Sequence, residues 1–174
     1  MKIGLISDTH LSSSGLPRAI ADAFQDVALI LHAGDLTTLD VLGRLEAIAP
    51  VTAVQGNMDL PGVRLKLPSK TTVEVEGRRV GLIHGHHVPN PDRVLSTLSP
   101  ANIQAIHDYL LSEFRDEAID CIVYGHTHYA LIETYRNVLM VNPGSATHGK
   151  GGRSTVGLLT ISQEGMRGEL VQLR

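Results

Sequence analysis

Short runs of apolar residues recur along this 174-residue chain, and each is followed at once by Gly, Asp or His. Five of them are four to six residues long and rich in Val, Ile or Leu: Lys2–Ser7, Ala28–Ala33, Val51–Gln55, Val80–Ile83 and Cys121–Tyr124. This length and composition are typical of strands that are buried on both faces. The apolar pattern therefore predicts a sheet core.

Apolar residues with helical spacing separate the first three of these runs. They are Leu16, Ile20, Ala23, Phe24 and Val27 in the first segment, and Leu39, Leu42, Leu45 and Ile48 in the second. Pro17 suits the first turn of a helix, Thr37 or Thr38 is expected to cap the second helix, and Pro50 ends it. Strands that alternate with helices pair in parallel, so the first third of the chain predicts a parallel sheet.

The pattern changes after residue 70, where strands follow one another directly. Alternating residues predict a hairpin of Thr71–Glu76 with Arg79–His84 around Gly77. Two more hairpins are predicted, Leu131–Tyr135 with Val138–Asn142 and Thr155–Ser162 with Met166–Leu173. A third helix is predicted to begin at Ser99-Pro100, and loops are predicted at Val88–Pro91 and His148–Gly152. With no repeat or linker, residues 1–174 are expected to form a single domain.

Composition limits the classes of function. The chain is 43% hydrophobic and 19% charged, which is ordinary for a soluble globular protein. A net charge of −3 argues against extended nucleic-acid binding, which needs basic surface. A strand that begins at Lys2, a single Cys121 and the lack of a long apolar stretch lead us to expect a cytoplasmic protein that does not bind membranes. A homo-oligomer is left open.

Six polar clusters follow the predicted strands. They are Asp8-Thr9-His10, Gly34-Asp35, Gly56-Asn57-Met58-Asp59, His84-Gly85-His86, Gly125-His126-Thr127-His128 and Asn142-Pro143-Gly144-Ser145. Each cluster alone also fits a turn, a cap or a buried histidine. Independent turns, however, have no reason to leave oxygen and nitrogen ligands at the ends of successive strands, where α/β proteins place their sites. Together the clusters predict a metal site with ligands enough for two ions.

The order D-x-H, GD, GN-x-D, H-G-H, GHTH and N-P-G-S resembles the calcineurin-like metallophosphoesterase family. The short chain and Met58 are similar to its small bacterial and archaeal phosphodiesterase branch, to which the retromer subunit of the same fold is related. The resemblance implies an α/β fold, a four-layer α/β/β/α sandwich of two mixed sheets flanked by helices. It also implies a dinuclear metal site at one edge.

The resemblance further implies how the ligands are shared. The first metal ion would be held by Asp8, His10, Asp35 and His128, and the second by Asp35, Asn57, His84 and His126, so that Asp35 bridges. Mn²⁺ is the favoured metal, with Ni, Zn, Fe and Co as alternatives. A hydroxide that bridges the two ions would attack a small phosphate ester. We expect Asp35, Asn57, His84 and His86 to take part in catalysis.

One residue departs from the pattern of the larger family members, which have a His after the Asn. Here that residue is Met58, which cannot protonate a leaving group, so His86 or His10 would substitute or the enzyme would favour good leaving groups. Asp59 is then expected to make a local turn or cap bond.

The resemblance allows a second function, a protein-binding scaffold like the retromer subunit with little or no catalysis. All seven ligand positions are filled, and this favours the enzyme, a dinuclear metal-dependent phosphodiesterase. A DNA-repair nuclease of the same superfamily fits poorly, because the chain lacks capping domains and basic surface.

Overall fold

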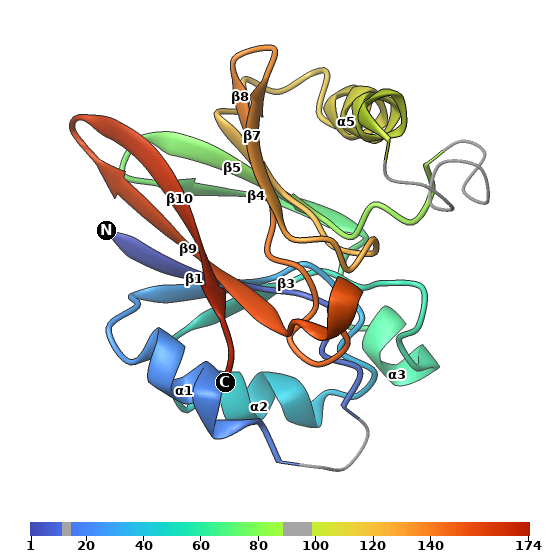
Figure 1. The fold of residues 1–174 in the computed structure, drawn as a ribbon, viewed down its shortest axis with the longest axis vertical. Coiled ribbons are helices and arrows are strands. Elements are labelled where there is room, and N and C mark those ends of the chain that lie inside the picture. The colour runs from blue at the N-terminus through green and yellow to red at the C-terminus, as the bar shows by residue number, and fades with distance from the viewer. Residues whose placement is uncertain (12–14, 89–98) are drawn as a thin grey trace.

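Two five-stranded sheets pack face to face, with helices on their outer sides (Figure 1). The computed structural model describes residues 1–11, 15–88 and 99–174. Its strands are β1 Lys2–Ile6, β2 Leu29–His32, β3 Val51–Ala53, β4 Lys70–Val75, β5 Arg78–Ile83, β6 Cys121–Val123, β7 Leu131–Tyr135, β8 Val138–Asn142, β9 Thr155–Ser162 and β10 Gly165–Gln172. Its helices are α1 Arg18–Phe24, α2 Asp40–Glu46, α3 Pro61–Arg64, α5 Pro100–Glu113 and the 3₁₀ turn η1 Lys150–Gly152.

The first sheet has the strand order β10-β9-β1-β2-β3. Strands β1, β2 and β3 are parallel, as the alternating pattern predicts, and the hairpin of β9 and β10 adds two antiparallel strands beside β1. Helices α1 and α2 cover the outer face, where Phe24 and Leu45 pack in one cluster with Ile6 and Ile30.

The second sheet has the order β4-β5-β6-β8-β7 and is also mixed. The hairpins β4–β5 and β7–β8 are antiparallel, whereas β6 pairs in parallel with both β5 and β8. Helix α5 covers its outer face through Ile106, Leu110 and Phe114, which pack with Ile122 and Met140. The four layers form the α/β/β/α sandwich that the resemblance implies.

The apolar runs are continuous because their strands are buried on both faces. In the first sheet, Leu5 and Leu31 face the second sheet, whereas their neighbours Ile6 and Ile30 face the helices. From the second sheet, Leu82 enters the same central cluster as Leu5 and Leu31. Such strands show no alternation of polar and apolar residues, so they read as short uninterrupted runs.

The structure corrects the predicted start of α2. Its N-cap is Leu39, which makes no capping bond through its side chain, so a cap at Thr37 or Thr38 is wrong. Thr37 instead has a φ of 77° and donates its amide N–H to the Asp59 carboxylate at 2.7 Å. The Thr38 hydroxyl donates to the carbonyl of Leu11. These residues serve the loops beside the strand ends rather than the helix.

Other predicted boundaries differ less. Helix α5 begins at Ser99-Pro100 as predicted, and Ser99 caps it, because its hydroxyl accepts a hydrogen bond from the amide of Asn102. The one-turn helix α3, which begins at Pro61, was not predicted from the sequence. Most of the loop predicted at Val88–Pro91 lies outside the described residues. Among the described residues, no helix is long and apolar enough to cross a membrane.

Candidate metal centre

The turns that follow four strands meet at one edge of the sandwich and hydrogen-bond to one another. The amide of Asp8, after β1, donates to the carbonyl of Gly34 after β2, at 3.0 Å. The amide of His10 donates to the carbonyl of Asp35 at 3.1 Å. The amide of Gly125, after β6, donates to the carbonyl of His84 after β5, at 3.2 Å. The two sheets therefore bring their polar clusters to a shared site.

Three residues expected to hold the first metal ion converge there. Asp8 Oδ1 lies 3.3 Å from His128 Nε2 and 3.9 Å from His10 Nε2. The two imidazole Nε2 atoms are themselves 3.2 Å apart. Potential ligand atoms of Asp8, His10 and His128 all lie within 4.8 Å of one another, so one ion could contact all three.

The residues expected to hold the second ion lie next to the first group. Asp35 Oδ2 lies 3.2 Å from His84 Nε2, and Asn57 Oδ1 lies 3.2 Å from the same nitrogen. Asp8, Asp35 and His84 also place ligand atoms within 4.8 Å of one another. Asp8, Asp35 and His84 are buried.

Asp35 lies between the two groups. Its Oδ2 atom is 3.2 Å from His84 Nε2 on one side and 3.9 Å from His10 Nε2 on the other. Its Oδ1 atom accepts a hydrogen bond from the amide of Met58 at 2.8 Å. Burial raises the pKa of Asp35, but the hydrogen bond and charge of His84 and the Met58 amide outweigh it and lower the pKa to about 2. The carboxylate is therefore ionised at neutral pH.

Backbone carbonyls orient two of the imidazole rings. His84 Nδ1 lies 2.7 Å from the carbonyl oxygen of Ala33, and His128 Nδ1 lies 3.0 Å from that of His148. A carbonyl only accepts hydrogen bonds, so each Nδ1 donates, and each Nε2 faces a carboxylate, that of Asp35 for His84 and that of Asp8 for His128. Burial opposes the charged form of His84, but the carboxylates of Asp35 and Asp8 outweigh it and raise its pKa, and the Asp8 carboxylate raises the pKa of His128. A metal ion would take the place of the Nε2 proton, as in metal-ligating histidines whose other nitrogen donates to a carbonyl.

His126 provides an independent test of whether the residues fit a metal ion. Its Nε2 atom is buried and has no hydrogen-bond partner in the described part of the chain. Its ring lies 5.2 Å from the ring of His84, and its amide donates to the carboxylate of Asp8. Burial and the neighbouring His84 lower the pKa of His126 to about 4, so the ring is neutral and able to coordinate. A buried nitrogen without a partner at this place fits a metal ligand.

The backbone of the site is strained. Five of the seven expected ligands have a positive φ, namely Asp8, His10, Asp35, His126 and His128. Residues other than glycine rarely adopt this conformation, which costs about 1–3 kcal/mol each and is concentrated at functional sites. The strain was not predicted from the sequence.

Glycines in the motifs allow the ligands to approach closely. A Cβ atom on Gly56 would lie 2.1 Å from Asp35 Oδ1, and one on Gly125 would lie 2.9 Å from Asp8 Oδ2. A Cβ on Gly34 would lie 2.8 Å from His84 Nδ1. The glycines that read as turn residues in the sequence are therefore needed by the ligands of neighbouring loops.

His32 is a residue of the site that sequence reasoning left without a role. It is completely buried, accepts the amide N–H of Gly34 on Nδ1, and contacts the Thr9 hydroxyl through Nε2. Burial lowers its pKa to about 3, so it stays neutral and supports the turns that carry Asp8 and Asp35. The only feature of the sequence that pointed to this supporting role was the position of His32 at the end of β2, next to Gly34-Asp35.

The remaining polar residues support the ligands. Both oxygens of Asp59 accept backbone amides, from Thr37 and from Gly56, which confirms the expected turn bond. The hydroxyl of Ser145 donates to the carbonyl of Asp8 at 2.7 Å, so the last motif shapes the wall of the site. Asn142 donates to the carbonyl of Gly125.

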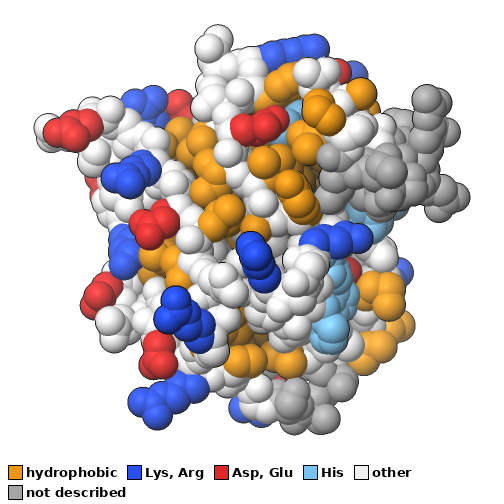
Figure 2. Space-filling model, in the orientation of Figure 1, with side chains coloured by type: hydrophobic (Ala, Val, Ile, Leu, Met, Phe, Trp, Pro, Cys, Tyr) orange, Lys and Arg blue, Asp and Glu red, His pale blue; other side chains and the backbone are white. Residues whose placement is uncertain are grey.

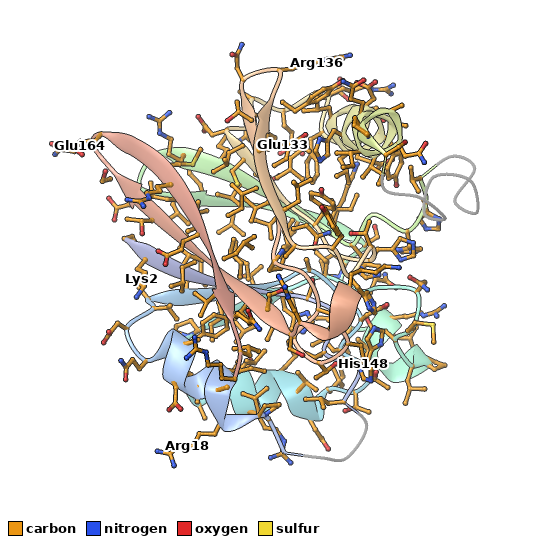
Figure 3. All side chains as sticks on the ribbon, viewed as in Figure 1. Lys2, Arg18, Glu133, Arg136, His148 and Glu164 are labelled. Atoms are coloured by element: carbon orange, nitrogen blue, oxygen red, sulfur yellow. The ribbon has the colours of Figure 1, made fainter. Side chains whose placement is uncertain are left out.

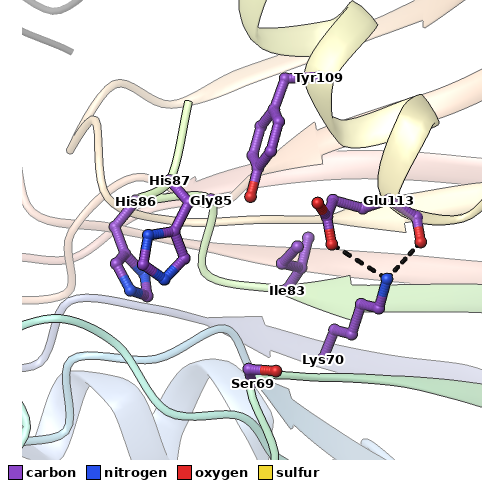
Figure 4. Close-up of a pocket in the computed structure, with 8 residues that line it drawn as sticks. All are labelled: Ser69, Lys70, Ile83, Gly85, His86, His87, Tyr109 and Glu113. Atoms are coloured by element: carbon purple, nitrogen blue, oxygen red, sulfur yellow. Dashed lines mark hydrogen bonds and ion pairs between the residues drawn. The ribbon is translucent and has the colours of Figure 1, made fainter. Parts of the chain in front are cut away.

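His86 lies beside the centre and lines a pocket of about 310 Å³ (Figure 4). Its ring is 5.4 Å from that of His84, and its buried Nδ1 atom has no partner among the described residues. The pocket continues past His87 to Tyr109 and to the ion pair of Lys70 with Glu113. Burial lowers the pKa of His86 to about 4.

His107 has a structural role. It is buried in α5 between the hydroxyl of Tyr124, at 2.9 Å, and the carboxylate of Glu133, at 3.0 Å. Glu133, the partner of His107, lies far from His148 in Figure 3. His148 lies on the side of the molecule that also carries η1 and α3.

The fit between Gly56 and Asp35 gives a test of the site. Gly56→Ala should weaken metal binding about 10–100-fold, because its methyl group would displace the Asp35 carboxylate. Gly62→Ala is the matched control, since a Cβ there meets nothing within 4 Å. Titration of both variants with Mn²⁺ by calorimetry checks the difference. Equal affinities for the two variants would show that Asp35 is not a ligand.

Comparisons with known proteins identify the family of this chain. Residues 1–164 match the calcineurin-like phosphoesterase superfamily domain. A probable metallophosphoesterase from Methanothermobacter thermautotrophicus is 40% identical over 174 residues, with 99% of this chain and 92% of the relative covered. A phosphodiesterase from Methanocaldococcus jannaschii is 28% identical, with 96% and 97% covered.

Solved structures show the same fold. An archaeal phosphodiesterase has a TM-score of 0.73 at 27% identity, with 98% of this chain and 100% of that chain covered. Zn²⁺-complexed Vps29 from Entamoeba histolytica has a TM-score of 0.71 at 21% identity, with 100% of both chains covered, and is similar in fold alone. The family match, the 40% identical relative and the shared architecture lead to one conclusion: this chain belongs to the calcineurin-like phosphoesterase superfamily.

Proposed function

We propose that this protein is a dinuclear metal-dependent phosphodiesterase that hydrolyses a small phosphate ester. The observation that carries the proposal is the position of Asp35, whose Oδ2 atom faces both His10 and His84. A carboxylate in this position can join two metal ions and reduce their mutual repulsion. Asp8, His10 and His128 would complete one ion's ligands, and Asn57, His84 and His126 the other's.

Two divalent ions held by these residues would clamp the oxygens of a phosphate ester and lower the pKa of a bound water. The residues of the chain contribute positioning. Ala33 and His148 fix the rings of His84 and His128 through their carbonyls. The Met58 amide holds Asp35 Oδ1, while Oδ2 faces His84 and His10. Ligands of oxygen and nitrogen without sulfur fit Mn, Fe, Zn, Co or Ni, and the resemblance to the family favours Mn²⁺ among them.

His86 is the residue best placed to touch the substrate without holding metal. It lies next to His84 and opens into the pocket of Figure 4. A neutral imidazole there would donate its ring N–H to an oxygen of the phosphate ester and so position it. We assign its role to substrate contact.

A protein-binding scaffold, which the resemblance to the retromer subunit allows, is the second candidate. Their likeness to this chain is in fold, at 20–22% identity for three of them. A scaffold does not need seven potential ligands at one edge, a buried His126 nitrogen without a partner, and strain in five ligand residues. These features support the enzyme.

The direct test is a reconstitution panel. Metal-stripped protein, verified by elemental analysis, should not hydrolyse bis(p-nitrophenyl) phosphate, and Mn²⁺ should restore activity that a chelator removes again. Running monoesters and cyclic nucleotides beside the diester identifies the preferred ester class. Full activity in the stripped sample, or none with any of the five metals, would rule the proposal out.

The bridging role of Asp35 predicts an order of effects between two variants. Asp35→Asn should reduce the rate at limiting Mn²⁺ by at least about 10²-fold, because it weakens both metal sites and removes charge from between two cations. His10→Ala should reduce the rate less, since it removes a ligand from one ion only. Rates measured across an Mn²⁺ titration compare the two. Near-normal turnover of the Asp35 variant would contradict the bridge.

Met58 predicts a preference among leaving groups. Its side chain is 59% exposed and has no proton to donate, so the protein should hydrolyse aryl esters far faster than alkyl esters. Met58→His should narrow that gap by raising the alkyl rate, within the roughly 10²–10⁴-fold typical of general acid catalysis. Both Asp59 oxygens bind backbone amides and would stay in place. The slope of log rate against leaving-group pKa measures the effect, and a shallow slope in the unmodified protein would show that another donor already acts.

A further inference from the structure

A second pocket adjoins the centre on the side of His128. It has a volume of about 380 Å³, within the range of small-molecule sites, and its lining includes Tyr129, Lys150 and Arg153. No acidic residue lines this pocket in the described part of the chain. By contrast, the pocket beside His86 contains a cation that is already neutralised, because Lys70 pairs with Glu113 at 3.0 Å. The pocket beside His128 is therefore positively charged in a protein whose net charge is −3.

Lys150 and Arg153 are exposed, and neither forms an ion pair with any described acidic residue. Two cations that line one pocket repel each other, and an anion between them would relieve the repulsion. The guanidinium of Arg153 can bind two oxygens of a phosphate or carboxylate at once, and Lys150 adds a compact charge. The side chains of Lys150 and Arg153 are therefore suited to bind a phosphate or carboxylate group.

The position of these charges is fixed relative to the metal centre. His128 Nδ1 donates to the carbonyl of His148 at 3.0 Å, and the amide of Lys150 donates back to the carbonyl of His128 at 3.1 Å. Gly149 packs so tightly that a Cβ atom there would lie 1.7 Å from the carbonyl oxygen of Arg153. The loop that carries both cations is thus bound directly to a predicted metal ligand. Figure 2 shows Lys and Arg side chains beside a group of histidines on this face.

We propose that Lys150 and Arg153 form a subsite for a second anionic group of the substrate. This inference rests on the proposed function, because it assumes that the scissile phosphate lies at the metal centre. The substrate class is then a small phosphate ester that carries another phosphate or a carboxylate at the end of a short arm. The exposed ring of Tyr129 and the side chain of Leu170 provide apolar surface along which such an arm can lie.

Three matched diesters test the subsite. Each is a p-nitrophenyl phosphodiester with a two-carbon second arm, which ends in a methoxy group, a carboxylate or a phosphate. With Mn²⁺ at low ionic strength, kcat/KM should be about tenfold or more higher for an anionic arm than for the methoxy arm, as expected for charge-assisted hydrogen bonds. The carboxylate and phosphate arms separate the two sources of the anion.

The Lys150→Gln, Arg153→Gln double variant should bring this ratio close to one. The ratio compares two substrates on one protein sample, so a general loss of metal or stability cancels. A Lys66→Gln, Arg167→Gln double variant removes two exposed cations outside the pocket lining and should keep the ratio. A Lys150→Arg, Arg153→Lys exchange should keep most of it. An unchanged ratio in the Gln double variant would overturn the subsite.

A binding measurement separates the subsite from the proposed function. Inorganic phosphate, titrated into metal-stripped protein and followed by NMR, should shift the resonances of residues 148–155 in the unmodified protein and not in the Gln double variant. If this binding is seen but no ester is hydrolysed with any metal, the phosphodiesterase proposal fails and the anion subsite stands. If phosphate binds both proteins equally, the subsite is wrong whatever the activity.

Discussion

The structure depends on holding two buried carboxylates, Asp8 and Asp35, at the same place. Their oxygens lie together with His84 Nε2 within 4.8 Å, and both side chains are almost completely buried. Like charges at this distance repel, and burial removes the water that would screen them. Backbone amides offset part of this cost, since His126 donates to Asp8 and Met58 donates to Asp35. Metal cations between the carboxylates would offset the rest of it, which is the physical reason to regard the edge as a candidate metal centre.

Holding the carboxylates in this way requires the strained turns. A strand that simply continued would alternate its side chains between the two faces of the sheet and would carry Asp8 or Asp35 away from the edge. The left-handed backbone at both residues redirects the side chains toward each other, and the tight packing of Gly56 and Gly125 provides the space. The strain is supported by the sandwich beneath, in which Ile6 and Leu31 are completely buried. The core thus stabilises a site that would not form by itself.

The contrast between buried strands and strained turns explains which features could be predicted from the sequence. Buried strands have uninterrupted apolar runs, so β1, β2 and β6 were predictable within a residue or two, and so were the parallel pairing and the later hairpins. The ligand types were readable because carboxylates and imidazoles follow those runs. The start of α2 was not predictable, because the backbone of Thr37 is bound by Asp59, which lies 22 residues away in the sequence. Nor was the role of His32, whose partners in neighbouring turns are known only once the strands are paired.

The two pockets beside the candidate metal centre differ in charge, and the composition of the chain does not show this difference. A net charge of −3 argues against broad binding to polyanions, yet it says nothing of how the charges are distributed. Around the centre, the pocket beside His86 contains an ion pair that cancels internally, whereas the pocket beside His128 has two cations and no acidic residue among its described lining. The two sides of the candidate metal centre thus differ in charge. For a phosphodiester with two unlike arms, an asymmetric site of this kind would favour one orientation of the ester and so decide which arm leaves.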